Sequence, residues 1–202
     1  MSPPSEPTLE DRDIPPDLAD QFQVAFGLDE SPATLAEWAE GTSLLLETAR
    51  RQRSFDDWCR VDRSRHEVRS PKPAYYMGLF DTLLVLSIRG KSGEGTIRSH
   101  SPVSERLVEV HSADDGMSVT PGDAVMSFGV ATDVVSARYF EVPDRIAYTR
   151  FSQYTNAFSK LPAYERWDRA TAEAETMMIP LSVGLALARR VLATYDQPLT
   201  FW

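Results

Sequence analysis

The stretch Ala74-Tyr75-Tyr76-Met77-Gly78-Leu79-Phe80-Asp81-Thr82-Leu83-Leu84-Val85-Leu86 is the most apolar segment of the chain, and it carries one carboxylate. Phe80, Leu83 and Leu84 recur at the spacing i, i+3, i+4, which predicts a helix that starts near Ala74. A helix that is apolar almost all round is usually buried, and a buried carboxylate is costly unless it is paired or hydrogen-bonded. Asp81 is therefore either a helix-start residue bonded to backbone N–H groups or a carboxylate kept for chemistry, and the sequence leaves both interpretations open.

Further motifs follow this stretch in a fixed order along the chain. They are Arg98-Ser99-His100-Ser101-Pro102-Val103-Ser104, Val119-Thr120-Pro121-Gly122-Asp123-Ala124-Val125-Met126-Ser127-Phe128, Phe151-Ser152-Gln153-Tyr154-Thr155-Asn156-Ala157-Phe158 and Pro162-Ala163-Tyr164-Glu165-Arg166-Trp167. With Gly78–Leu84 and the apolar C-terminal helix, the ordered set resembles the organomercurial (alkylmercury) lyase family. The resemblance covers the chain from about Ala74 to Ala193 and implies the fold of that family.

The chain departs from the family at two positions that matter for chemistry. The family's first catalytic cysteine falls on Gly78 and its second on Ser152, while the aspartate is kept at Asp81. Soft metals select thiolate ligands, and neither a glycine nor a serine hydroxyl replaces one. The resemblance therefore implies the family fold with its mercury chemistry removed.

The predicted fold class is α+β, with a small helical N-terminal region and an antiparallel or mixed β-sheet core packed with helices, as in organomercurial lyases. Residues 1–16 hold five of the 14 prolines and are predicted to form a disordered arm. Residues 17–72 are predicted as the helical region and residues 73–202 as the core.

Local patterns predict individual elements within these regions. Helices are predicted at 17–26, ending at Gly27, at 32–50 with Ser31 as N-cap, from Ser54, at 163–175 and at 181–195. Strands are predicted at 95–100, 107–111, 117–120 and 124–130, joined as an antiparallel meander, and again within 145–156.

The resemblance implies that the segments around Asp81 and Ser152 face each other across one pocket. Asp81 is the predicted general acid or base, and Ser152 is the predicted catalytic partner that holds a substrate oxygen. A glycine at 78 in place of cysteine is expected to open space beside the carboxylate. The candidate substrate-binding residues are Tyr75, Tyr76, Gly78, His100, Tyr154 and Asn156. A purely structural role stays open for each group.

Composition excludes several classes of partner. The formal net charge of −9 argues against nucleic acid and against an anionic membrane, and the arginines between Arg50 and Arg69 are interpreted as a solvated face. No apolar run reaches the length of a membrane-spanning helix, and no secretory signal is recognised, so a cytoplasmic location is expected. The single cysteine, Cys59, excludes an internal disulfide and fits a reducing compartment.

No metal site or cofactor is predicted, because Cys59 and His66 lack further ligands nearby. The expected partner is a small-molecule substrate or ligand. The aromatic tail Pro198-Leu199-Thr200-Phe201-Trp202 either folds back on the body or enters a second copy, which would make a homodimer.

Three functions are consistent with these features. The first is a repurposed enzyme of this fold that transfers a proton on a small organic substrate, as a lyase, isomerase or cyclase, in specialised metabolism. The second is a non-catalytic small-molecule-binding protein with the same pocket. The third, a residual alkylmercury lyase, ranks last because both cysteines are missing.

Overall fold

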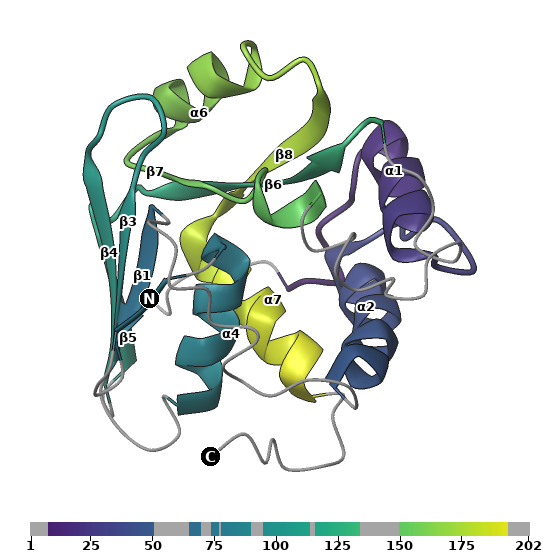
Figure 1. The fold of residues 1–202 in the computed structure, drawn as a ribbon, viewed down its shortest axis with the longest axis horizontal. Helices are drawn as coiled ribbons and strands as arrows, with labels where there is room; N and C mark the ends of the chain where they lie inside the picture. Colours follow the sequence, from purple (N-terminus) through teal and green to yellow (C-terminus); the bar gives the residue numbers. More distant parts are fainter. Residues whose placement is uncertain are drawn as a thin grey trace, which may run out of the picture.

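The computed structural model describes residues 8–50, 65–69, 74–76, 78–89, 95–113, 116–133 and 150–193 (Figure 1). It confirms the α+β class, with helices first and antiparallel sheets after them. One sheet has the strand order β2-β1-β3-β4-β5, formed by Ala74–Tyr76, His66–Arg69, Gly95–His100, Leu107–Ala113 and Gly116–Thr120. The other has the order β7-β6-β8, formed by Ala157–Phe158, Val125–Ala131 and Ala174–Pro180.

The helices fill the space beside the two sheets. In the part of the chain that the structure describes, they are α1 (Pro16–Phe26), α2 (Leu35–Arg50), α4 (Leu79–Arg89), α6 (Leu161–Asp168) and α7 (Leu181–Ala193). Figure 1 shows α4 and α7 lying side by side, with α4 next to the five-stranded sheet and α2 on the far side of α7. None of the helices in the described part of the chain has the length and apolar character needed to span a bilayer.

The N-terminal helices form largely as their patterns predict. Helix α1 begins with proline in its first turn and ends at Gly27, whose φ of 64° is the left-handed conformation that glycine tolerates. The N-cap of α2 is Thr34, whose hydroxyl accepts the backbone N–H of Glu37 at 3.2 Å. Ser31, the predicted cap, instead donates its hydroxyl to Asp20 of α1 at 2.7 Å, so that prediction was wrong.

A cluster of aromatic rings joins the N-terminal helices to the rest of the core. Trp38 of α2 lies 4.8 Å, centroid to centroid, from Phe128 of β6 and 5.6 Å from Phe80 of α4. Phe22 of α1 lies 5.0 Å from Phe128. These rings are fully or almost fully buried, and they belong to one continuous hydrophobic core with α7 and both sheets. Burial of this kind is the main source of stability in such a fold.

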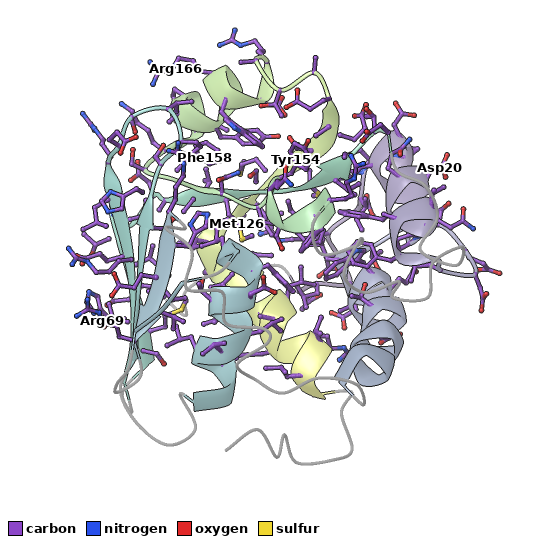
Figure 2. The ribbon with its side chains drawn as sticks, in the orientation of Figure 1. Asp20, Arg69, Met126, Tyr154, Phe158 and Arg166 are labelled. Carbon is purple, nitrogen blue, oxygen red and sulfur yellow. The ribbon has the colours of Figure 1, made fainter. Side chains whose placement is uncertain are left out.

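Two faces of the three-stranded sheet are covered by different elements. Met126 of β6 packs toward Gly184 of α7 and Leu83 of α4. Phe158 of β7 lies on the opposite side, where its ring is 5.7 Å from that of Tyr164 in α6 (Figure 2). The alternation of side chains along the paired strands β6 and β7 produces this division.

Three predicted elements differ in the structure. Ala74–Tyr76 is strand β2 and not the start of the helix, which begins at Leu79. The fourth strand of the predicted meander, β6, leaves the five-stranded sheet and pairs with β7 and β8. The helix predicted to run to residue 175 ends at Asp168, and β8 follows it from Ala174.

A fourth difference concerns the segment that carries Ser152. Residues 150–152 are helical and only Ala157–Phe158 pairs as a strand, so the strand predicted within 145–156 was wrong for its described residues. The helix predicted from Ser54 and the aromatic C-terminal tail lie outside the described residues, as do residues 1–7 of the predicted arm. Residues 8–16 are described, and there Ile14 donates its backbone N–H to Ala33 at 2.8 Å.

Candidate functional site

The start of α4 combines a helix cap with a carboxylate. The carbonyl of Gly78 accepts the backbone N–H of Thr82 at 3.0 Å, which makes Gly78 the N-cap residue. The carboxylate of Asp81, three residues later, accepts a hydrogen bond from the backbone of Gly78. This is one half of a capping box, in which the third helical side chain satisfies the N–H of the cap residue. Gly78 has no side chain to supply the other half. Asp81 therefore has the structural role that its sequence position allows.

Asp81 also meets Ser152, which is 71 positions away in the chain. The hydroxyl of Ser152 donates to Oδ2 of Asp81 at 3.4 Å, and both side chains are half-buried. A Cβ added at Gly78 would lie 2.9 Å from that same Oδ2 and 2.9 Å from Cβ of Ser152. The structure thus brings Gly78, Asp81 and Ser152 into direct contact.

The expected open space beside the carboxylate is not found at the Cβ position of residue 78. Real Cβ atoms essentially never approach other heavy atoms within 3.0 Å, and here two such approaches occur at once. Glycine at this position lets the backbone of Gly78 and the side chain of Ser152 approach closely. The position of a side chain at residue 78 is therefore taken up by contacts with Asp81 and Ser152.

The environment of Asp81 favours its protonated form. Burial raises the pKa of Asp81 from 3.8 to about 7, and the hydrogen bonds from Ser152 and the backbone of Gly78 only partly oppose this rise. The carboxyl group is therefore divided between its acid and base forms near neutral pH. Because both forms are populated near neutral pH, such a group can act either as a proton donor or as a proton acceptor.

The turn that presents Ser152 is fixed by hydrogen bonds to β6. The hydroxyl of Ser127 donates to the carbonyl of Tyr154 at 2.7 Å and accepts the backbone N–H of Asn156 at 2.9 Å. The backbone N–H of Ser127 donates to the carbonyl of Asn156 at 2.9 Å. Within the turn, the hydroxyl of Thr155 donates to the carbonyl of Ser152 at 3.1 Å. We refer to residues 152–156 as the serine turn.

A buried polar group that sequence reasoning did not identify lies behind the serine turn. His66 of β1 and Ser99 of β3 are paired across the strands, and Nδ1 of His66 is 2.7 Å from Oγ of Ser99. His66 also forms a side-chain hydrogen bond with Asn156. These three residues are 5%, 1% and 6% exposed, in the order His66, Ser99, Asn156. The antiparallel register of β1 and β3 brings His66 to Ser99, and the serine turn brings Asn156 to His66, so the sequence around His66 carries no signal for the contact.

Burial keeps the imidazole of His66 neutral. Desolvation, followed by the nearby charges of Arg65 and His100, lowers the pKa of His66 from 6.5 to about 4, while the hydrogen bond with Asn156 works in the opposite direction. The contacts are mutually consistent when Nδ1 accepts from Ser99 and the other ring nitrogen donates to the amide oxygen of Asn156. The amide nitrogen of Asn156 then donates to the carbonyl of Gln153, at 3.0 Å.

The remaining predicted site residues occupy different places. Tyr75 and Tyr76 lie in the edge strand β2, where Tyr76 is paired with Glu67, and their side chains are not described. His100 is exposed at the end of β3, and its ring lies 3.4 Å from the carbonyl of Glu105. The phenol of Tyr154 is half-buried, and its pKa is raised by burial and by the charges of Glu173 and Asp133. Asn156 has the internal role just described.

Within the residues that the structure describes, no group of three His, Cys, Asp or Glu side chains is arranged to hold a metal ion. Cys59 lies outside those residues.

A search of protein families and a search of curated proteins found no match to this chain. Among solved structures, the crystal structure of the mercury-bound form of MerB2, an organomercurial lyase, matches with a TM-score of 0.51 and 12% sequence identity. The match covers 76% of this chain and 73% of that chain. At this identity the likeness is one of fold, and it supports an organomercurial-lyase-like fold for the chain.

Proposed function

We propose that this protein is an enzyme of organomercurial-lyase-like fold that transfers a proton on a small organic substrate, with Asp81 as the general acid or base and without thiol or mercury chemistry. The observation that carries the proposal is the contact between the half-buried carboxyl of Asp81 and the hydroxyl of Ser152, at 3.4 Å. The two residues come from distant parts of the chain and meet at a helix N-terminus.

The chemistry suited to this pair is proton abstraction from a carbon next to a carbonyl group. The carboxylate of Asp81 takes the proton as the carbon–hydrogen bond breaks, and the electron pair moves toward the substrate oxygen. The hydroxyl of Ser152, whose bond to Asp81 is long, rotates to donate to that oxygen. Return of the proton to carbon completes an isomerisation, or loss of a neighbouring group completes an elimination.

A raised pKa supports this assignment because a general base works best when its pKa lies near the working pH. The pKa of Asp81, about 7, meets that condition. A carboxylate with an ordinary pKa is a weaker base toward a proton on carbon. The structural capping role of Asp81 is compatible with this function, since only one of its interactions is needed to hold the side chain.

The proposal is tested by hydrogen–deuterium exchange at carbon. Pyruvate, acetoacetate and oxaloacetate, each with an acidic carbon–hydrogen bond beside a carbonyl, are incubated with the protein in heavy water and followed by proton NMR. We expect exchange faster than in buffer for at least one of them, abolished in Asp81→Asn and slowed in Ser152→Ala. Exchange that is equally fast in Asp81→Asn would refute the assignment of Asp81.

The alternative is a non-catalytic binding protein of the same fold, which the capping role of Asp81 favours. It predicts that the same compounds raise the melting temperature of the protein in the wild type and in Asp81→Asn without any exchange. A residual alkylmercury lyase is tested with phenylmercury acetate, where release of benzene would contradict the proposal. We expect none, because glycine and serine stand at the matched cysteine positions.

A further inference from the structure

We propose that His66 is a positioning residue, which acts through Asn156 to fix the serine turn and thereby holds the hydroxyl of Ser152 against the carboxylate of Asp81. The inference deepens the proposed function, since it assigns a residue outside the contact pair to the same site. It rests on a continuous series of hydrogen bonds between the two sheets.

The imidazole of His66 is anchored in the five-stranded sheet. His66 lies in β1, with Val68 of the same strand fully buried and Ser99 of the neighbouring strand bonded to Nδ1 at 2.7 Å. Both β1 and β3 belong to the five-stranded sheet and contact α4, the helix that carries Asp81. The imidazole is thus fixed to the same body as the carboxylate.

Asn156 connects His66 to the serine turn. Asn156 bonds His66 with its side chain and donates its amide nitrogen to the carbonyl of Gln153 at 3.0 Å. The backbone of the same residue exchanges hydrogen bonds with Ser127 of β6 in the other sheet. Asn156 is therefore held from both sheets, and it in turn holds the residue next to Ser152.

Losing the contact between His66 and Asn156 leaves a buried polar atom without a partner. Asn156 is 6% exposed, so removing His66 leaves the amide oxygen of Asn156 buried without that partner. Movement of the turn toward solvent would satisfy this oxygen. Movement of the turn lengthens the contact from Ser152 to Asp81, which at 3.4 Å is already near the limit of a hydrogen bond.

The experiment measures the pKa of the Asp81 carboxyl group, because that value reports the contact with Ser152 and requires no substrate. The full chain is labelled with ¹³C-aspartate, the Asp81 signal is identified by its loss in Asp81→Asn, and the signal is titrated by NMR. Ser152→Ala is the reference variant. It is expected to raise the pKa of Asp81 by roughly half a unit to one unit, the value of one hydrogen bond to the charged form.

We expect His66→Phe and Asn156→Ala each to raise the pKa of Asp81, as Ser152→Ala does. Neither rise should exceed the rise that Ser152→Ala causes. Adding Ser152→Ala to either variant should give the value of Ser152→Ala alone, since all three changes remove the same contact. His66→Gln, which keeps one donor and one acceptor, should restore most of the wild-type value. If His66→Phe does not fold, as judged by circular dichroism, Asn156→Ala decides the question.

Tyr164→Phe provides a matched control. It removes part-buried hydrogen bonds to Asp168 of the same helix and to Thr176 of β8, away from the serine turn. It should lower stability and leave the Asp81 titration unchanged. The proposal is overturned if folded His66→Phe and Asn156→Ala titrate like the wild type while Ser152→Ala does not, or if Ser152→Ala itself has no effect. Neither result depends on whether the exchange test detects an activity.

Discussion

At the scale of single residues, the carboxyl group of Asp81 has two roles. As one half of a capping box it satisfies the backbone N–H of Gly78 at the start of α4, and as a desolvated acid it is partly protonated near neutral pH. Capping carboxylates at exposed helix ends are stabilising because they are charged. Asp81 gives up part of that benefit through burial, which is the kind of local conflict that is concentrated at functional sites.

The raised pKa of Asp81 predicts a particular dependence of stability on pH. The folded protein keeps the proton up to about pH 7, whereas the unfolded chain loses it near pH 3.8. The folded state therefore binds more protons between these values, and the contribution of Asp81 to the free energy of unfolding falls as pH rises through this window and is constant above it. Urea unfolding of the wild type and of Asp81→Asn from pH 4 to 8 checks this.

We expect the stability of the wild type, relative to Asp81→Asn, to decline from pH 4 to 7 and then to level off. Asp123→Asn removes an exposed carboxylate in the turn before β6 and controls for the change in net charge. A stability of the wild type relative to Asp81→Asn that rises with pH would contradict a raised pKa for the Asp81 carboxyl group.

Gly78 and Ser152 are predicted to be energetically coupled. A side chain at residue 78 meets Cβ and Oγ of Ser152 at 2.9 and 3.0 Å. We expect Gly78→Ala to lower the free energy of unfolding by about 1–3 kcal/mol, the usual cost of overpacking. Combining it with Ser152→Gly should recover part of this loss, because the opposing Cβ is then gone.

The coupling is measured by a double-mutant cycle from urea unfolding curves. Ser152→Gly alone provides the second edge of that cycle. Strict additivity of the two single changes would show that the close approach at Gly78 is absent in solution.

At the scale of elements, the close pairing of β6 with β8 depends on another glycine. A Cβ at Gly129 would lie 2.5 Å from the backbone carbonyl oxygen of Glu175, and a backbone atom cannot move aside as a side chain can. Gly129→Ala should therefore lower the free energy of unfolding by roughly 2–4 kcal/mol. Gly122→Ala, where the nearest atom is 4.0 Å away, should change it by less than about 0.5 kcal/mol.

Thermal or urea unfolding of the two glycine variants gives the comparison directly. Equal stabilities for Gly129→Ala and Gly122→Ala would show that the β6–β8 pairing tolerates a side chain at this point.

Elements with a clear period were predictable from sequence, and those decided by tertiary pairing were not. Phe22 and Phe26 mark α1 by their helical spacing, and the apolar run from Leu181 marks α7. Ala74–Tyr76 is apolar and continuous with the helix that follows, so nothing local separates the strand from the helix. Strand β8 has intermediate burial at almost every position and therefore lacks the alternation by which a half-buried strand is recognised.

The sequence predicted the contact between Asp81 and Ser152 but not the contact between His66 and Asn156 that supports it. The resemblance placed Asp81 opposite Ser152, and the structure brings these side chains together. The roles proposed for them stay predictions. The His66–Asn156 contact depends on strand register and on a turn between two sheets, neither of which a pattern of residue types encodes.

At the scale of the whole molecule, the aromatic cluster makes the N-terminal helices part of the central core. Phe22 contacts Phe128 of β6 and Phe151 beside Ser152, with ring centroids 5.0 and 6.2 Å apart. Phe22→Ala should therefore lower the free energy of unfolding by about 3–5 kcal/mol. It should do so without separating the unfolding of the helices from that of the sheets.

Far-ultraviolet circular dichroism and tryptophan fluorescence, followed through the same urea titration, test whether the helices and the sheets unfold together. Coincident transitions in wild type and variant are expected. Two transitions in Phe22→Ala would show that α1 and α2 unfold as an independent unit.

The packing around Gly78 has a consequence for how such a site can change over generations. Because Ser152 already fills the place of a side chain at 78, a thiol cannot be gained there until the opposing residue has become smaller or has shifted. A larger side chain at residue 78 is therefore expected to be accepted only after residue 152 has become smaller.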